Sequence, residues 1–290
     1  VLLSSLNSCY SPWAGFAQPT STPEYTPDTN WSSEQLATAL YSLNQTNRLL
    51  ALKYLKERGA GAAPAVPALI NILRSSPSVD ARAEAYNVLG SIGPEAKDAV
   101  PVLIEELKEG KTRTDKLGAA AGLGTIGPGA KDAIPILIRM GLDDSDDRVR
   151  SSATESLGKI SFDKDVLDFL ISRMGAEKSG EVQIGISRGL CAMGTKARPA
   201  VPYLAKNLWW GKDDHDIKQI AAKAISTIAE VEFYDNGCAQ GGFKEFINGE
   251  LRIVLEARTW WTNTGQYQKW LQLSTLTSTD RSEFGKLIAS

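Results

Sequence analysis

The chain has few of the side chains that most often build metal and catalytic sites. Its 290 residues contain one histidine, His215, and three cysteines, Cys9, Cys191 and Cys238. A single imidazole removes most histidine-built metal sites and most His-dependent activation of a serine or cysteine nucleophile. No two cysteines form a Cys-x-x-Cys pair, so a zinc or thioredoxin-like motif has no support. The sequence therefore predicts neither a metal nor another cofactor.

Charge of one sign and long apolar runs are also missing. The chain carries 32 basic and 34 acidic side chains, a formal net charge of −2. Nucleic-acid binders usually carry a clear basic excess, because neutralising phosphates supplies most of their affinity. No stretch approaches the roughly 20 apolar residues of a membrane-spanning helix, although hydrophobic residues make up 42% of the chain and suffice for a core. The composition therefore favours neither a nucleic-acid partner nor a transmembrane helix.

The sequence contains one motif in several copies. GPEAKDAVPVLIEEL runs from Gly93 to Leu107, and GPGAKDAIPILIRM follows from Gly127 to Met140, a step of 34 residues. The preceding phrase Leu-Gly-x-Ile-Gly recurs at the same step, and related copies extend a period of 33 to 35 residues over six units. A period in this range is typical of a stacked solenoid, in which each unit buries its apolar face against the next.

Each unit contains two helical patterns. Apolar residues spaced by four, such as Ala85 and Leu89, indicate the first helix, and the glycine that ends its phrase is predicted to form a left-handed cap. The second helix begins at Val-Pro-x-Leu-Ile, because proline in the first turn loses no intrahelical hydrogen bond. Aspartates at one aligned position are predicted N-caps of the second helices: Asp98, Asp132 and Asp165.

Two aligned sets of residues are predicted to join neighbouring units. One set is mainly basic, and we expect it to form a structural ladder with loop acids rather than a phosphate site: Arg82, Lys116, Arg150, Gln183 and Lys218. The other set consists of glycines inside helices, each costing about 1 kcal/mol against alanine, which predicts close helix packing rather than a ligand groove: Gly118, Gly122, Gly185 and Gly189. Both sets are interpreted as structural.

Several reactive or charged groups are interpreted in the same way. The acidic run from Asp143 to Asp147 lacks the spacing of a calcium loop and suits the start of a helix. Cys191 stands where other units have glycine, which predicts a small buried filler, and His215 is placed in a polar loop between units. The acids of the second helices are expected on a solvated face: Glu105, Glu106, Asp165 and Asp168.

The pattern resembles the HEAT-repeat family, in the subtype found in phycobilin-lyase-like proteins. DDSDDRVRSSATESLGKI, from Asp143 to Ile160, carries the resemblance most clearly, and the likeness covers about Trp31 to Arg258. It implies an all-α, right-handed solenoid of about six helix pairs that serves as a non-catalytic scaffold for another protein. Two alternatives stay open: a phycobilin-lyase-like chaperone or lyase subunit, and a HEAT-like DNA alkylation glycosylase, which the neutral charge balance disfavours.

The ends of the array set the domain boundaries. Residues 31–258 are predicted as the solenoid, whose first helix starts with the capping-box phrase NWSSEQL and runs to about Arg58. The stretch from Phe243 to Arg258 is predicted as the second helix of the sixth pair. Residues 259–290 are predicted as a helical cap over the last core surface. Two tryptophans are expected in the core of this cap: Trp260 and Trp261.

Residues 1–30 are predicted to be an export-signal remnant and a linker. QPTSTPEYTPDTN is rich in Pro, Thr and Ser and has no period. Gly15-Phe16-Ala17 offers the small residues that a signal peptidase prefers, whereas Leu6-Asn7-Ser8-Cys9 resembles a bacterial lipobox, which would make Cys9 a lipidated N-terminus. We expect export to the periplasm, cell envelope or lumen by one of these routes; a tail on a cytoplasmic protein is the alternative.

Trp209 and Trp210 are the predicted partner-binding residues. In the other units the position of Trp210 is polar or small, as in Ser75 and Glu109, which is typical of a site that faces solvent. Tryptophan is enriched at binding hot spots because it buries a large area and still offers a hydrogen-bond donor. Packing under the loop from Asp235 to Gly242 is the alternative interpretation.

Overall fold

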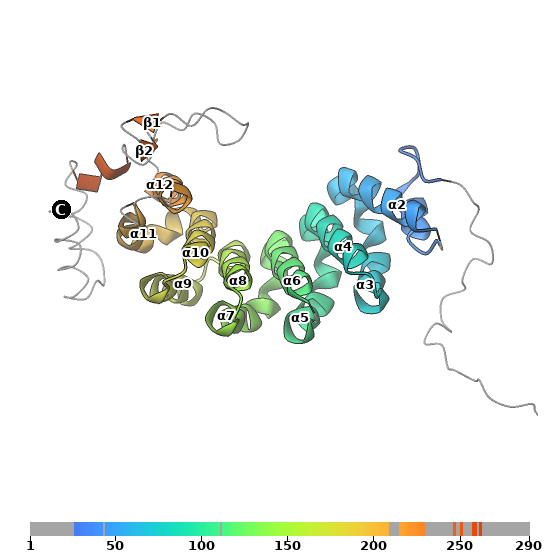
Figure 1. Ribbon diagram of the computed structural model, residues 1–290, viewed down its shortest axis with the longest axis horizontal. Helices are drawn as coiled ribbons and strands as arrows, with labels where there is room; N and C mark the ends of the chain where they lie inside the picture. Colours follow the sequence, from blue (N-terminus) through green and yellow to red (C-terminus); the bar gives the residue numbers. More distant parts are fainter. Residues whose placement is uncertain are drawn as a thin grey trace, which may run out of the picture.

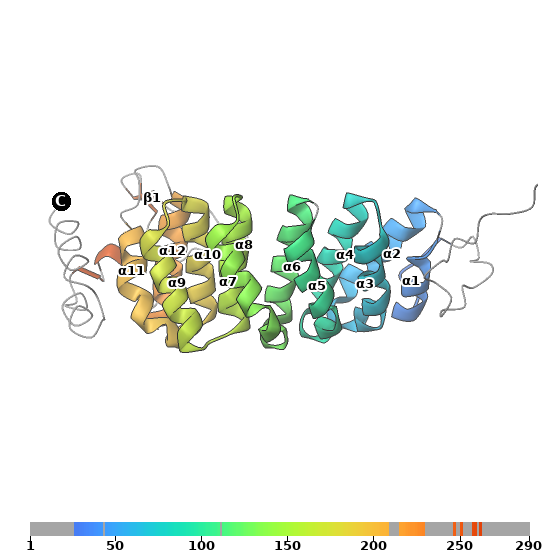
Figure 2. The same cartoon turned by 90° about the horizontal axis from the view of Figure 1, so that it is seen from below.

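The repeated units form an arc of stacked helix pairs. The computed structural model describes residues 26–42, 44–110, 112–208, 215–229, 246–247, 250–251, 257–259 and 261–262. Within these residues, six pairs of α-helices follow one another in two layers (Figures 1 and 2). The inner layer lies on the concave side of the arc, and the outer layer covers its convex side (Figure 1). This arrangement confirms the predicted all-α solenoid.

Inner and outer helices alternate along the chain. The inner layer consists of α2 (Gln45–Arg58), α4 (Val79–Ile92), α6 (Arg113–Ile126), α8 (Asp147–Ile160), α10 (Gly180–Ala192) and α12 (His215–Ala229). The outer layer consists of α1 (Ser33–Ala39), α3 (Val66–Ser75), α5 (Val100–Glu109), α7 (Ile134–Asp143), α9 (Lys164–Ala176) and α11 (Val201–Asn207). Each inner helix packs on its paired outer helix and on its inner neighbours, and their facing sides form one continuous apolar core.

Short 3-10 helices join most inner helices to the next outer helix: η1 (Gly59–Ala65), η2 (Gly93–Ala99), η3 (Gly127–Ala133) and η4 (Gly194–Ala200). Each begins at a glycine with positive φ, for example 70° at Gly93 and 68° at Gly127, a value that strains other residues. The ψ angles of these two residues are −133° and −136°, outside the left-handed helical region. The glycines therefore turn the chain as predicted, but they do not form left-handed helical caps.

The predicted aspartate N-caps are wrong. Asp98 and Asp132 lie inside η2 and η3, and the outer helices that follow have alanine at the N-cap, with no side-chain hydrogen bond. The chain enters α5 from a helical turn, and the Val100 N–H already donates to the Lys97 carbonyl. Because that turn satisfies the first donor, a capping side chain is not required. Asp165 lies in the first turn of α9, after the N-cap Asp163.

The first predicted helix is in fact two. The capping box forms as expected, since the Ser32 side chain accepts from the Gln35 N–H and the Gln35 side chain accepts from the Ser32 N–H. The helix nevertheless ends at Ala39, and Asn44 caps a second helix by accepting from the N–H groups of its first turn. A second cap inside the segment supports a new helix start there, so α1 and α2 form the first pair.

The C-terminal part also differs from the prediction. Two short antiparallel strands, β1 (Phe246–Ile247) and β2 (Glu250–Leu251), lie where a helix was expected. The intervening sequence is Asn-Gly, the strongest two-residue signal for a hairpin turn. Trp261 is 1% exposed and packs in the apolar core, as predicted for this end of the array, whereas Trp260 lies outside the described residues.

Among the described residues, none of the helices combines the length and apolar character needed to cross a membrane.

Candidate functional site: an inner face backed by a polar ladder

The aligned basic residues form a polar ladder, in which residues of the inner helices bind groups in the loops of the same and the next unit. In its best-formed rung, Arg82 binds Asp115 through Nε and Oδ1 at 2.8 Å and through Nη2 and Oδ2 at 3.0 Å. Arg82 also donates to the Ser76 carbonyl at 2.9 Å. Asp115 is only 1% exposed and completes a capping box with Thr112 at the start of α6. This rung therefore joins two inner helices through a buried, bidentate ion pair.

The next two rungs are looser. Lys116 binds Asp144 at 2.8 Å with a side chain that is 30% exposed. Arg150 lies 3.5 Å from the Glu177 carboxylate and donates to the Asp144 carbonyl at 2.8 Å. The predicted structural ladder is confirmed for Arg82, Lys116 and Arg150, because each binds an acid in a loop or at the start of a helix.

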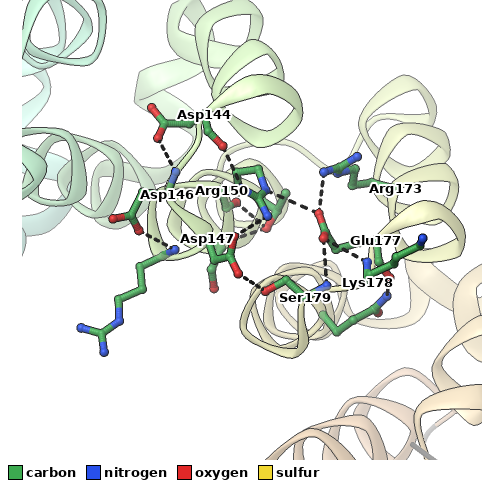
Figure 3. Close-up of polar contacts among 12 residues, drawn as sticks. Asp144, Asp146, Asp147, Arg150, Arg173, Glu177, Lys178 and Ser179 are labelled. Atoms are coloured by element: carbon green, nitrogen blue, oxygen red, sulfur yellow. Dashed lines mark hydrogen bonds and ion pairs between the residues drawn. The ribbon is translucent and has the colours of Figure 1, made fainter.

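Figure 3 shows the network around the Arg150 rung. Glu177 lies between Arg150 and Arg173, with Arg173 at 2.5 Å, and accepts the Ser179 N–H at 2.9 Å. Asp147 joins the same network by accepting from Arg150 and from the Ser179 hydroxyl, each at 2.6 Å. The network thus links the loop before α8 to the loop before α10.

The acidic run 143–147 is part of this structural network. Asp144 belongs to the Lys116 rung, and Asp146 caps α8 through the Arg148 N–H and binds Arg113 at 2.8 Å. These contacts confirm the interpretation as a helix start. In the part of the chain that the structure describes, no group of three or more His, Cys, Asp or Glu residues is placed to hold a metal ion.

One rung is uncharged. The Gln183 side chain accepts from Asn207 at 3.1 Å and donates to the carbonyls of Met174 at 2.8 Å and Glu177 at 2.9 Å. Gln183 is 1% and Asn207 is 2% exposed. Gln183 was predicted to belong to the ladder, whereas Asn207, the last residue of α11, was not predicted.

A further rung was missed at the start of the array. Arg48 donates to the Ser42 carbonyl at 2.6 Å, six residues before it, as Arg82 does to Ser76 and Arg150 does to Asp144. Arg48 stands 34 residues before Arg82, so the period alone could have identified it.

Ion pairing in the ladder lowers the pKa of its acids. Burial by itself raises the pKa of Asp115, but the hydrogen bonds from Arg82 and Thr112 outweigh it and hold the pKa below the ordinary value. The same balance, with Lys116 as the main donor, lowers the pKa of Asp144. Glu106 behaves differently from the solvated acid that was expected: it is half-buried, and burial, helped by the Asp115 charge, raises its pKa.

Glycines decide how closely the inner helices approach one another. A Cβ on Gly158 would lie 2.1 Å from the Gly189 carbonyl oxygen, and one on Gly185 would lie 2.3 Å from the Ser151 carbonyl oxygen. A Cβ on Gly118 would lie 2.3 Å from the Tyr86 ring. These distances are far shorter than any allowed contact. The predicted close helix packing is confirmed for Gly185 and Gly189, whose added Cβ atoms would meet the backbone of α8, whereas Gly118 makes room for the Tyr86 side chain; Gly158 was not predicted. Gly122 is less crowded, with its nearest neighbour at 3.4 Å.

The exposed sides of the inner helices form the candidate binding face. On α4 and α6 this face carries one exposed acid, Asp80, at one end and otherwise uncharged side chains: Ala83, Asn87, Ser91, Thr114, Leu117, Ala121 and Thr125. On α8, α10 and α12 it carries charges, including Glu155, Lys159, Arg188 and Lys223. The middle of the face, on α4 and α6, therefore differs in charge from α8, α10 and α12 although all derive from the same repeat; α2, at the end of the array, again carries exposed charges, Lys53 and Glu57.

The structure places the other predicted site residues as follows. Cys9, Trp209 and Trp210 lie outside the described residues, the two tryptophans in the sequence between α11 and α12. His215 is the first residue of α12 and not a loop residue, because the helix begins earlier than its apolar pattern suggests. Cys191 is a free thiol that packs against the apolar core and is half-buried rather than buried.

Comparison with known protein families agrees with this geometry. Residues 100–190 match the family model described as HEAT repeats. A comparison with curated proteins finds no significant match. The matched segment runs from the start of α5 to α10, which is the regular centre of the array. Residues 100–190 are therefore similar to HEAT repeats, and the helix pairs on either side extend the same solenoid.

Proposed function

We propose that the protein is a non-catalytic scaffold that binds another protein on its inner face. The observation that carries this proposal is that the polar groups of the ladder are paired with one another, whereas those of the inner face are open to solvent. The loop acids and the ladder cations are occupied with one another, whereas the inner face presents side chains such as Asn87 and Ala121 directly to solvent. HEAT repeats commonly serve as protein-interaction scaffolds, and a stack of rigid helices offers a continuous concave surface.

The choice of the inner face can be tested by site-specific photo-crosslinking. A photoreactive amino acid is placed at Asn87 or Ala121 on the inner face, and at Glu105 or Arg139 on the outer face, all of which are exposed. We expect the inner positions to give a discrete crosslinked partner, identified by mass spectrometry, and the outer positions to give none. Crosslinks from the outer positions alone would contradict the proposal.

Trp209 and Trp210 remain proposed partner contacts at the end of the array. Tryptophan at an interface typically contributes about 2 kcal/mol or more to binding, whereas a buried tryptophan contributes about 3–5 kcal/mol to stability. The variant Trp210→Ala should therefore weaken partner binding without lowering the melting temperature. A large fall in melting temperature without a binding defect would refute this assignment.

Export remains a proposal that rests on the sequence alone. Cleavage after Ala17 would leave Gln18 as the first residue, whereas lipidation would leave a blocked Cys9. Sequencing of the mature N-terminus, with mass spectrometry of the N-terminal peptide, separates the two. An intact upstream sequence in the cytosolic fraction would contradict both.

The chaperone or lyase alternative rests on the resemblance of the segment from Asp143 to Ile160, which forms α8 and the turn before it. Titration of the purified chain with a free bilin, followed by absorbance, tests it. A specific absorbance shift with saturation would favour this alternative over a scaffold for protein partners.

A further inference from the structure

We infer that the inner face of α8, α10 and α12 binds an acidic segment of a partner protein, through Lys159, Arg188 and Lys223. This inference rests on the proposed function and specifies the chemistry of the partner. Three observations support it. The cations are exposed on the concave side, they outnumber the acids there, and the equivalent positions on α4 and α6 are uncharged.

The location of the three cations on the inner face follows from their spacing to the ladder residues. Arg188 and Lys223 each lie five residues after a rung residue of their helix, which is the centre of the exposed stripe of an inner helix. Lys159 lies one turn further along α8. The side chains of Arg188 and Lys159 are 52% and 39% exposed, and Lys223 is exposed. All three therefore face solvent on the concave side.

The cations outnumber the acids at this place. Glu155 binds Lys159 at 2.6 Å and lies 3.6 Å from Arg188 Nη1. The second distance is too long for a hydrogen bond, so the Arg188 guanidinium keeps its donors for another acceptor. Lys223 makes no ion pair within the described part of the chain. Three positive charges and one negative charge leave an excess of two on this patch, although the whole chain has a net charge of −2.

Exposed cations of neighbouring inner helices adjoin only in this half of the face: Lys53 of α2 has the same repeat position, but the next two inner helices are uncharged there. At the same repeat positions, α4 and α6 carry Asn87 and Ala121, which are uncharged. The opposite end of the charged half carries Arg148, Glu181 and Asp216, seven residues before Glu155, Arg188 and Lys223 and about 10 Å away along the helix axes. Their charges do not add to the positive excess. A ligand is therefore expected to cross α8, α10 and α12 near their C-terminal halves.

A carboxylate-bearing segment fits this patch better than a nucleic acid. An arginine with free donors can bind a carboxylate through two hydrogen bonds. Binding of single-stranded nucleic acid relies on aromatic side chains that stack on bases, and α8, α10 and α12 contain no Phe, Tyr or Trp. With neighbouring helices 8–10 Å apart, the three cations span about 20 Å. An extended chain covers that distance with about six or seven residues.

Titration of the full chain with a defined peptide tests the inference. The probe is a fluorescent octaglutamate peptide, and binding is followed by anisotropy at low and at physiological salt. The double variant Arg188→Glu, Lys223→Glu should bind at least about tenfold more weakly than the parent chain. The variant Glu155→Gln should bind about two- to threefold more tightly, because it removes the only acid of the patch. Thermal melting by circular dichroism checks that each variant is folded.

A matched charge reversal serves as the control. Lys108 and Arg139 are exposed on the outer helices α5 and α7, so Lys108→Glu, Arg139→Glu changes the net charge equally without touching the inner face. An equal loss of binding in this control overturns the inference, as does failure of the parent chain to bind the peptide. Tighter binding of a thymidine octanucleotide than of octaglutamate overturns it as well. Photo-crosslinks from Asn87 and Ala121 that persist in any of these cases would leave the scaffold function intact.

Discussion

Two interfaces between inner helices show that one repeat can be joined in different ways. Between α4 and α6 the contact is made by side chains: the Tyr86 ring lies on Gly118, and Arg82 forms a bidentate pair with buried Asp115. Between α8 and α10 the backbones themselves meet, with Gly158 directly against Gly189. The rung at this second interface is weaker, since Arg150 lies 3.5 Å from Glu177. One interface is thus held largely by a buried ion pair and the other by close packing.

Glycine placement, and not the period, therefore sets the distance between units. A residue with a Cβ at Gly158 or Gly189 would force the helices apart, whereas the room at Gly118 is filled by a tyrosine from the neighbouring helix. The ladder accommodates both distances because long arginine and lysine side chains reach loop acids over a range of separations.

Removal of the buried acid should have the largest effect. In Asp115→Ala, Arg82 loses its partner while remaining largely buried and α6 loses its capping box, which should cost about 3–5 kcal/mol of stability. Hydrogen exchange should show the loss in α4 to α6 first. The exposed pair Lys164–Asp168 provides the control, and Asp168→Ala should leave the melting temperature unchanged. Equal effects of the two variants would show that the buried rung does not hold this interface.

A side chain at the contact between Gly158 and Gly189 should lower the stability nearly as much. Gly158→Val places a Cβ 2.1 Å from the Gly189 carbonyl oxygen, and relief requires movement of backbone rather than of a flexible side chain. Overpacking of this kind costs about 3 kcal/mol. Chemical denaturation measures the cost, and hydrogen exchange should place it in α8 and α10. Exchange that instead rises in α4 and α6 would contradict the proposed division between the two interfaces.

Acid should loosen the charged rungs before the uncharged one. The native pKa of Asp115, of Asp144 and of Glu177 is lowered, so the stability they contribute is present above the ordinary carboxyl pKa near 4 and is lost as the pH falls through the native pKa. Gln183 and Asn207 do not titrate. Brief pepsin digestion at decreasing pH should therefore cut between α4 and α9 before it cuts α11, which the uncharged rung holds.

Glu106 affects the pH dependence of stability in the opposite direction. Burial raises its native pKa, so protonation of Glu106 favours the folded state as the pH falls, opposite in sign to the rung acids. The variant Glu106→Gln removes that contribution and isolates the rungs. Simultaneous cleavage of all helices in this variant would show that the neutral rung gives no protection.

Substitution of a glycine that has room for a Cβ should give the smallest change in stability. Gly175 in α9 has no atom within 4 Å of an added Cβ and has an ordinary φ. Gly175→Ala should therefore stabilise the chain by about 0.5–1 kcal/mol, because alanine lowers the entropy of the unfolded state. Thermal melting measures the gain. A loss of stability would show that the position has a contact that the Cβ geometry does not reveal.

Sequence patterns predicted the features that depend on residues close together in the chain. The period identified the solenoid, the glycine at the end of each phrase identified a positive φ, and the aligned cations identified the ladder. The Asn-Gly hairpin signal and Arg48 were also present in the sequence but were overlooked. Helix ends were predicted less well: Asn44 and the 3-10 turns compete with the expected caps, and only the surrounding backbone decides which hydrogen bonds form.

The sequence by itself determined that the units are helical, that they stack and that polar groups join them, because the hydrophobic pattern and the glycines act over a few residues. Only the tertiary structure decided which acid meets which cation. Asp115 is 33 residues from Arg82 and Asp144 is 28 residues from Lys116, so the pairing depends on the separation and rotation of adjacent helices. The same holds for the contrast between the uncharged middle of the inner face on α4 and α6 and the positive patch on α8, α10 and α12. It exists only because packing turns Ala121 and Arg188 to one concave surface.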